Sequence, residues 1–161
     1  MPEKIKVALV GLGNCFSGLI QGIEYYSKNP SQKVTGIIHE NLRDYTIHDI
    51  DFVAGFDVGA NKIGKPINEA IYESPNMVDW IEKNDMPKAK GTVYESPALD
   101  GVGIWVENKV KPIESGKSES ELRDEIISIL EENGVEVIVS YLPVGSEKAT
   151  QFWAQICLDT N

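Results

Sequence analysis

The sequence is poor in cysteine and histidine, with only two of each among 161 residues. Cys15 and Cys157 form no CxxC pair and have no histidine at metal-ligand spacing, so the sequence predicts neither a disulfide framework nor a bound metal. It also lacks a long apolar run near its N-terminus, because residues 7–10 are too few for the core of a secretion signal. We therefore expect a cytoplasmic protein that does not associate with membranes.

Positive charge is scarce as well. The chain has 15 lysines and arginines against 25 aspartates and glutamates, which gives a formal net charge of −10. Its lysines alternate with acidic residues, as over 107–119, instead of forming a basic patch. Such a charge distribution repels nucleic acids and anionic surfaces, so we expect neither as a partner. The length favours a single domain over residues 1–161.

The first half of the chain contains two strand-and-helix patterns. Residues 4–10 include a continuous apolar run, which is typical of a strand buried on both faces of a parallel sheet. From Cys15 onwards, apolar residues recur every three or four positions and predict a helix that ends near residues 29–30. The polar segment 31–49 is interpreted as an insertion. A second strand is expected over 52–57 and a second helix over 63–72.

The second half continues the alternation. Short strands are expected at 92–94 and 103–106, and a capping box at 118–121 predicts a helix that Asn133 and Gly134 close. An apolar strand over 135–142 precedes a last helix with Ser146 as N-cap candidate. The expected buried face of that helix comprises Ala149, Phe152, Trp153, Ile156 and Cys157. This order predicts an α/β fold, a Rossmann-type doubly wound parallel sheet with strand order 3-2-1-4, truncated so that strand 135–142 is an uncovered edge.

A glycine-rich turn joins the first strand to the first helix. Dinucleotide pyrophosphates bind to the N–H groups at a helix N-terminus, where glycines keep side chains away from the ligand. The sequence therefore predicts cofactor binding by Gly11, Gly13, Asn14 and Cys15. Phe16 stands where the usual fingerprint has a third glycine, so the match is partial, and a plain tight turn is the alternative interpretation.

Two further strand ends complete the expected cofactor site. Asp57 ends the second strand, where an acidic residue accepts hydrogen bonds from the adenosine ribose and favours NAD over NADP, although Lys62 and Lys65 nearby weaken that preference. It follows the glycine turn by more than the usual spacing of about 20 residues, which the insertion explains. The alternative is that Asp57 only caps the turn 57–59. At the end of the strand 135–142, the residues expected near the nicotinamide are Ser140, Leu142, Pro143 and Val144; a plain strand end and helix cap is the alternative there.

Five stretches together point to a particular family. They are VGLGNC at 10–15, LIQGIEYY at 19–26, FVAGFD at 52–57, LDG at 99–101 and SYLPVGSE at 140–147. With these stretches, the sequence resembles the myo-inositol-phosphate synthases of the bacterial and archaeal type nearly from end to end.

The resemblance implies an NAD-dependent, isomerase-type synthase of inositol and phospholipid biosynthesis. Such enzymes convert D-glucose 6-phosphate to myo-inositol phosphate by oxidation at C5, intramolecular aldol closure and return of the hydride. The resemblance further implies a homotetramer and catalytic lysines in a second, oligomerisation domain. We expect that domain beyond Asn161, so that this chain is an incomplete NAD-binding part, inactive alone. The alternatives are a stand-alone NAD-binding or regulatory module, or the cofactor domain of another NAD-dependent sugar or amino-acid dehydrogenase.

Overall fold

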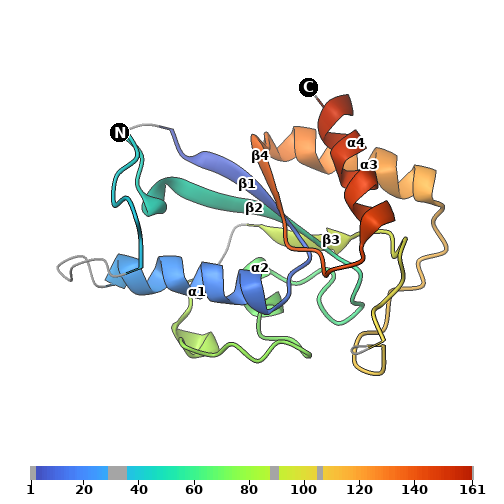
Figure 1. The fold of residues 1–161 in the computed structure, drawn as a ribbon, viewed down its shortest axis with the longest axis horizontal. Coiled ribbons are helices and arrows are strands. Elements are labelled where there is room, and N and C mark those ends of the chain that lie inside the picture. The colour runs from blue at the N-terminus through green and yellow to red at the C-terminus, as the bar shows by residue number, and fades with distance from the viewer. Residues whose placement is uncertain (1–2, 29–35, 88–90, 105–106, 161) are drawn as a thin grey trace.

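A computed structural model describes residues 3–28, 36–87, 91–104 and 107–160. Four parallel strands form one sheet in the order β3-β2-β1-β4, as the sequence predicts (Figure 1). They are β1 (Ile5–Val10), β2 (Ile50–Asp57), β3 (Thr92–Glu95) and β4 (Val137–Ser140). In the register of β1 with β2, Val7 faces Phe52 and Ala8 faces Ala54, so Val53 is an extra residue in β2.

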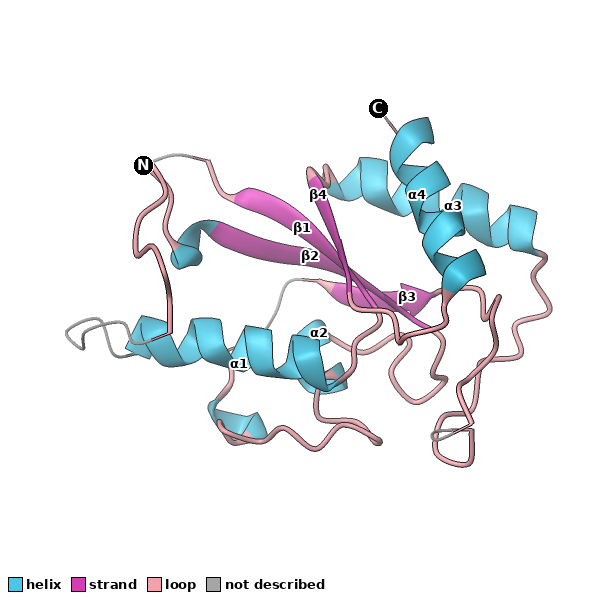
Figure 2. Ribbon diagram, in the orientation of Figure 1, coloured by secondary structure: helices cyan, strands magenta, loops and turns pink. Residues whose placement is uncertain are grey.

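Helices cover both faces of the sheet (Figure 2). On one face lie α1 (Asn14–Lys28) and the short α2 (Ile67–Ala70); on the other lie α3 (Glu119–Asn133) and α4 (Glu147–Asp159). Val7 and Leu9 of β1 belong to the core beneath α1, while Ala8 and Val10 belong to the core beneath α3 and α4. All four are at most 5% exposed, which confirms that β1 is buried on both faces.

Several element boundaries differ from the prediction. The helix expected over 63–72 contracts to α2, because Gly64 adopts a φ of +80° and Pro66 occupies the N-cap. Residues 103–104 form no strand, and 105–106 lie outside the described residues. The strand expected over 135–142 contracts to β4. In the described part of the insertion, 36–49, the ordered features are a bridge between Leu42 and Tyr45 and a 3₁₀ helix, Ile47–Asp49.

The two C-terminal helices begin differently. Ser118 caps α3 in a complete capping box with Glu121, and Gly134 ends α3 with a φ of +61°, both as predicted. Ser146 stands at the N-cap of α4, but its side chain makes no capping bond. Cys157 is exposed on α4, whereas the four other residues expected on its buried face are buried. No helix in the described ranges is long and apolar enough to cross a membrane.

Candidate functional site

The C-terminal ends of β1, β2 and β4 meet at one edge of the sheet (Figure 1). The N–H of Gly11 donates to the carbonyl of Phe56 in β2 at 2.9 Å, and the N–H of Tyr141, just after β4, donates to the carbonyl of Val10 at 3.0 Å. The glycine turn therefore lies between the other two strand ends. All three predicted parts of the site are brought together there, at the position where open α/β sheets bind ligands.

The two glycines of the turn have different surroundings. Gly11 has a φ of +80°, and a Cβ built on it would lie 3.3 Å from the carbonyl oxygen of Tyr141. A side chain is therefore strained there for reasons internal to the fold. A Cβ on Gly13 would meet nothing within 4 Å. The carbonyl of Gly13 accepts the N–H of Ser17 at 3.0 Å, so this open space adjoins the first turn of α1.

The N-terminus of α1 suits an anion. Its first turn contains no acidic residue, and the first N–H groups of a helix have no acceptor within the helix. Asn14 and Cys15 are exposed there. The Asn14 side-chain oxygen accepts the N–H of Met77 at 2.7 Å, so Asn14 also holds a distant loop.

Asp57 lies at the tip of β2 with its carboxylate turned into the protein. The residue is 8% exposed. Its Oδ2 accepts the N–H of Leu12 at 2.9 Å, and its Oδ1 accepts the N–H of Gly59 at 2.8 Å. The bond to Gly59 is the turn cap that the sequence left as an alternative. The bond to Leu12 links Asp57 directly to the glycine turn, while its contact with a ribose stays a prediction.

Two polar residues from later in the chain contact the backbone of the turn, and the sequence assigns no such contact to Lys62 and no role at all to Asn76. Lys62 is 4% exposed, and its Nζ donates to the carbonyl of Leu12 at 2.7 Å. Asn76 donates to the same carbonyl through Nδ2 at 2.9 Å. The sequence places Lys62 near the ribose as a charge that weakens the preference for NAD, whereas in the structure this charge is buried and bonded to the turn.

A loop spanning 76–81 runs beside α1 and is held by buried polar side chains of that helix. Gln21 is fully buried; its Nε2 donates to the carbonyl of Val78 at 2.8 Å, and its Oε1 accepts the N–H of Ile81 at 3.0 Å. The hydroxyl of Tyr72 donates to the carbonyl of Ile81 at 2.7 Å. Burial, and secondarily the charge of Asp79, raises the pKa of Tyr72 above its ordinary value.

The residues predicted near the nicotinamide occupy the end of β4 and the turn after it. Ser140 and Pro143 are exposed, and Val144 is fully so. Leu142 is half-buried and packs on the core beneath α3 and α4. The following helix is capped from a distance: Asp100 accepts the N–H groups of Lys148 and Ala149 at 3.1 and 2.8 Å. Asp100 belongs to the LDG stretch, so the structure gives that motif a physical role.

A pocket of about 280 Å³ opens beyond the tips of β2 and β3. It adjoins Asp57, because Val58 lines it, and its walls come from 95–99 and from the segment before α3. Three glutamates, Glu95, Glu114 and Glu119, line it together with Lys117. Pocket and glycine turn lie on the same edge of the sheet, on either side of Asp57.

Comparison with known proteins identifies relatives over nearly the whole chain. The inositol-3-phosphate synthase of Mycolicibacterium smegmatis is 40% identical over 157 residues, which are 97% of this chain and 41% of that protein. The inositol-3-phosphate synthase of Corynebacterium glutamicum is 40% identical over 156 residues, again 41% of its length. This chain is a homologue of inositol-3-phosphate synthases. It spans about two fifths of the length of these curated relatives.

Solved structures also resemble this chain in fold. The crystal structure of Ari2 matches this chain with a TM-score of 0.76 and 27% sequence identity. The match covers 98% of this chain and 44% of the Ari2 chain. A myo-inositol-1-phosphate synthase-related protein from Thermotoga maritima matches with a TM-score of 0.72 and 20% sequence identity. This match covers 98% of this chain and 45% of the Thermotoga maritima chain. The latter likeness supports the α/β fold alone. No family model matches the chain.

Proposed function

We propose that this chain is the NAD-binding part of an enzyme that converts D-glucose 6-phosphate to myo-inositol phosphate. The observation that carries the proposal is the open space at Gly13. A Cβ there would meet no atom of any residue other than its chain neighbours within 4 Å, although Gly13 lies just before α1, between two strand ends. The fold itself therefore does not require glycine at this contact point, whereas a pyrophosphate approaching the backbone does.

The remaining parts fit a dinucleotide laid across this edge. The first N–H groups of α1 would hold the pyrophosphate, and the pocket beside Val58 would take the adenosine half. Its three glutamates would repel a 2′-phosphate, which favours NAD over NADP. The nicotinamide half would lie toward Ser140 and the turn at 142–144. Bound NAD would accept a hydride from the sugar phosphate and later return it.

The first experiment is calorimetric titration with NAD of the wild-type protein and the variant Gly13→Ala. We expect wild-type binding and a loss of at least about tenfold in affinity in Gly13→Ala, because the added methyl group occupies the space of the pyrophosphate. Gly22→Ala is the matched control. Gly22 lies on α1, the helix that follows Gly13, and a Cβ there also has nothing within 4 Å, so its variant should bind NAD as the wild type does. An absence of wild-type binding, or equal binding by Gly13→Ala, would contradict the proposal.

A second titration, with NADP, tests the preference. We expect NADP to bind at least about tenfold more weakly than NAD, because its extra phosphate meets the carboxylates at the β2 and β3 tips. Equal affinity would contradict the assignment of Asp57 and the pocket to the adenosine ribose. The test uses two ligands and one protein, so folding differences between variants do not enter it.

The synthase reaction is a further proposal that rests on the homologues. We propose that the 161 residues bind NAD without turning over glucose 6-phosphate, since the resemblance assigns the substrate-side lysines to a second domain. The assay is phosphorus NMR spectroscopy of glucose 6-phosphate that has been incubated with the protein and NAD. Formation of inositol phosphate would show that these 161 residues suffice for catalysis.

A further inference from the structure

The backbone of Leu12, the middle residue of the glycine turn, is held on both sides by side chains from another segment. Its N–H donates to Oδ2 of Asp57 at 2.9 Å, and its carbonyl accepts Nζ of Lys62 at 2.7 Å and Nδ2 of Asn76 at 2.9 Å. Asp57 is the last residue of β2, and Lys62 and Asn76 lie in the segment that follows it. We call the group of Asp57, Lys62 and Asn76 the Leu12 brace.

The brace fixes two successive peptide planes. Each peptide unit is rigid, so holding its carbonyl oxygen also sets the direction of the next N–H. The Leu12 carbonyl belongs to the same unit as the N–H of Gly13, which donates to the carbonyl of Gly11 at 2.8 Å. The Leu12 N–H belongs to the unit that follows Gly11. The brace therefore determines the orientation of the turn on both sides of Leu12, next to two flexible glycines.

All three N–H donors of the Lys62 ammonium have an acceptor within this group of residues. It is 4% exposed, and besides Leu12 its ammonium lies 3.4 Å from Oδ2 of Asp57 and 3.4 Å from Oδ1 of Asn76. Three donors thus meet three acceptors. Burying a lysine is costly unless it is paired and hydrogen-bonded, and packing alone favours an apolar residue at such a place. The position of Lys62 therefore points to a role in holding the turn.

We propose that Lys62 is a positioning residue for the pyrophosphate-binding turn and that it acts through the carbonyl of Leu12. Asp57 supports the turn from the other side, and its bond to Leu12 makes it a structural partner of Lys62 as well as a candidate ribose ligand. This inference rests on the proposed NAD function. It adds a residue whose side chain bonds to the backbone of the turn, at the carbonyl next to Gly13.

The test uses a double variant, Asp57→Asn with Lys62→Met, compared with the single variant Asp57→Asn. Replacing Lys62 alone would leave the Asp57 carboxylate buried without its cation, whereas the pair of changes removes both charges. The asparagine side chain in both variants keeps an oxygen that can accept the N–H of Leu12. The two variants share the Asp57→Asn change and differ only at residue 62, whose side chain in the single variant still donates to the Leu12 carbonyl but has lost its carboxylate partner. Lys65→Met is the control for loss of a lysine, because Lys65 is more exposed and pairs with Glu73 at 2.7 Å.

Two readouts separate positioning from general stability. In ¹⁵N-resolved NMR spectra without ligand, we expect the amide signals of Leu12, Gly13 and Asn14 to shift in the double variant and not in Lys65→Met. In titrations, we expect NAD to bind about tenfold more weakly to the double variant than to Asp57→Asn. Adenosine, which has no pyrophosphate, should bind both equally. The proposal would be overturned if the double variant lost the same affinity for NAD and for adenosine relative to Asp57→Asn, or if it lost affinity for neither ligand.

The outcomes also separate this inference from the function on which it rests. If the wild-type protein binds no NAD, the proposed function fails, and the amide signals still decide whether Lys62 fixes the turn. If the double variant does not fold, Asn76→Ala provides the second route, because it removes one donor to the Leu12 carbonyl without removing a charge. Unchanged turn signals in a folded Asn76→Ala variant with wild-type NAD affinity would overturn the brace.

Discussion

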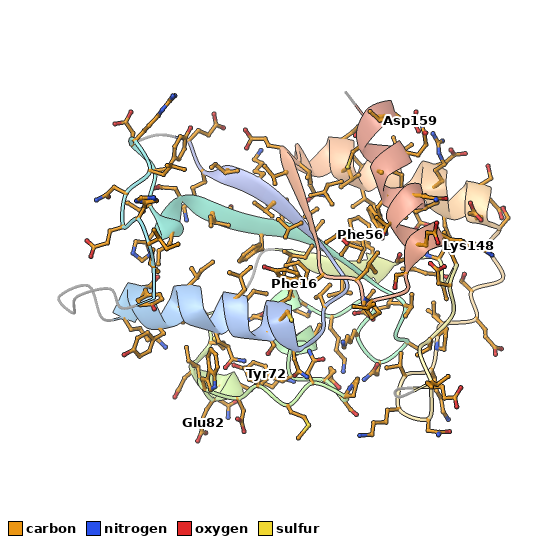
Figure 3. All side chains as sticks on the ribbon, viewed as in Figure 1. Phe16, Phe56, Tyr72, Glu82, Lys148 and Asp159 are labelled. Carbon is orange, nitrogen blue, oxygen red and sulfur yellow. The ribbon has the colours of Figure 1, made fainter. Side chains whose placement is uncertain are left out.

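The ring of Phe16, in the first turn of α1, lies 4.4 Å from the ring of Tyr141, centroid to centroid. Phe16 is on the sheet side of α1 and fully buried, and Tyr141 follows β4 (Figure 3). In the usual fingerprint a third glycine at this position allows close packing of helix and strand. Here an aromatic ring fills the space between them. Phe16 in place of the third glycine therefore changes how helix and strand pack, while the strand, turn and helix still follow one another as in the fingerprint.

Removing the Phe16 ring should therefore damage the fold. We expect Phe16→Ala to lower the free energy of unfolding by about 3–5 kcal/mol, the usual cost of deleting a fully buried aromatic ring. The variant Phe16→Leu should lose less because it refills most of the volume. Urea denaturation measures both. The control is Tyr25→Ala on the same helix, where the side chain is 48% exposed. If Phe16→Ala lowered the free energy of unfolding no more than the control does, this account would be contradicted.

Asp100 should stabilise α4 from a loop far away in the sequence. Its carboxylate accepts two N–H groups in the first turn of α4, where the helix dipole also favours a negative charge. We expect Asp100→Ala to cost about 1–2 kcal/mol of unfolding free energy, measured by thermal and urea denaturation. The matched control is Asp124→Ala on α3, whose side chain is 74% exposed and lies 3.6 Å from Arg123. That surface pair is worth little, so an equal cost for both variants would refute the distant cap.

The sequence predicts the sheet order and the helix ends that carry strong local signals. The apolar run in β1 and the capping box at Ser118 are both features that a few adjacent residues determine. Their physical causes, burial on two faces and satisfied N–H groups, act within one element. The prediction therefore needed no knowledge of tertiary contacts.

The contacts that the sequence did not predict connect residues far apart in the chain. Asp100 caps a helix 48 positions later, and Lys62 reaches a carbonyl 50 positions earlier. Gln21 is buried on α1 because a loop some 60 residues away supplies its partners. Hydrophobic periodicity carries no information about such pairs, since a polar residue on a helix has the same pattern whether water or a distant loop faces it.

The attachment of the loop 76–81 should depend on pH through Tyr72. Its pKa is raised above the ordinary tyrosine value of 10.0, first by burial and then by Asp79. A raised pKa means that the folded protein favours the protonated hydroxyl, the form that donates to Ile81. This contribution to stability is fully present below pH 10 and is lost as the pH rises through the raised value.

The measurement is the alkaline absorbance titration of the wild-type protein minus that of Tyr72→Phe. The difference curve isolates Tyr72, and we expect its midpoint above pH 10. We also expect Tyr72→Phe to lose about 0.5–1.5 kcal/mol of unfolding free energy at neutral pH, because a hydrogen bond to Ile81 is removed. A difference curve with its midpoint at or below pH 10 would contradict the burial of this hydroxyl.

The free edge of β4 should govern self-association. Among the described strands β4 pairs only with β1, and Val137 on it is 42% exposed. An apolar edge strand with unpaired N–H and carbonyl groups is a template for pairing with another chain, and a lysine on such an edge blocks that pairing. We expect Val137→Lys to shift the protein toward monomer in sedimentation velocity experiments across a concentration series. Leu158→Lys is the control, because it adds the same charge in place of an exposed apolar residue on α4. An equal reduction of association by both variants would show that net charge is the cause. A reduction by Val137→Lys alone would show that the edge of β4 mediates the association.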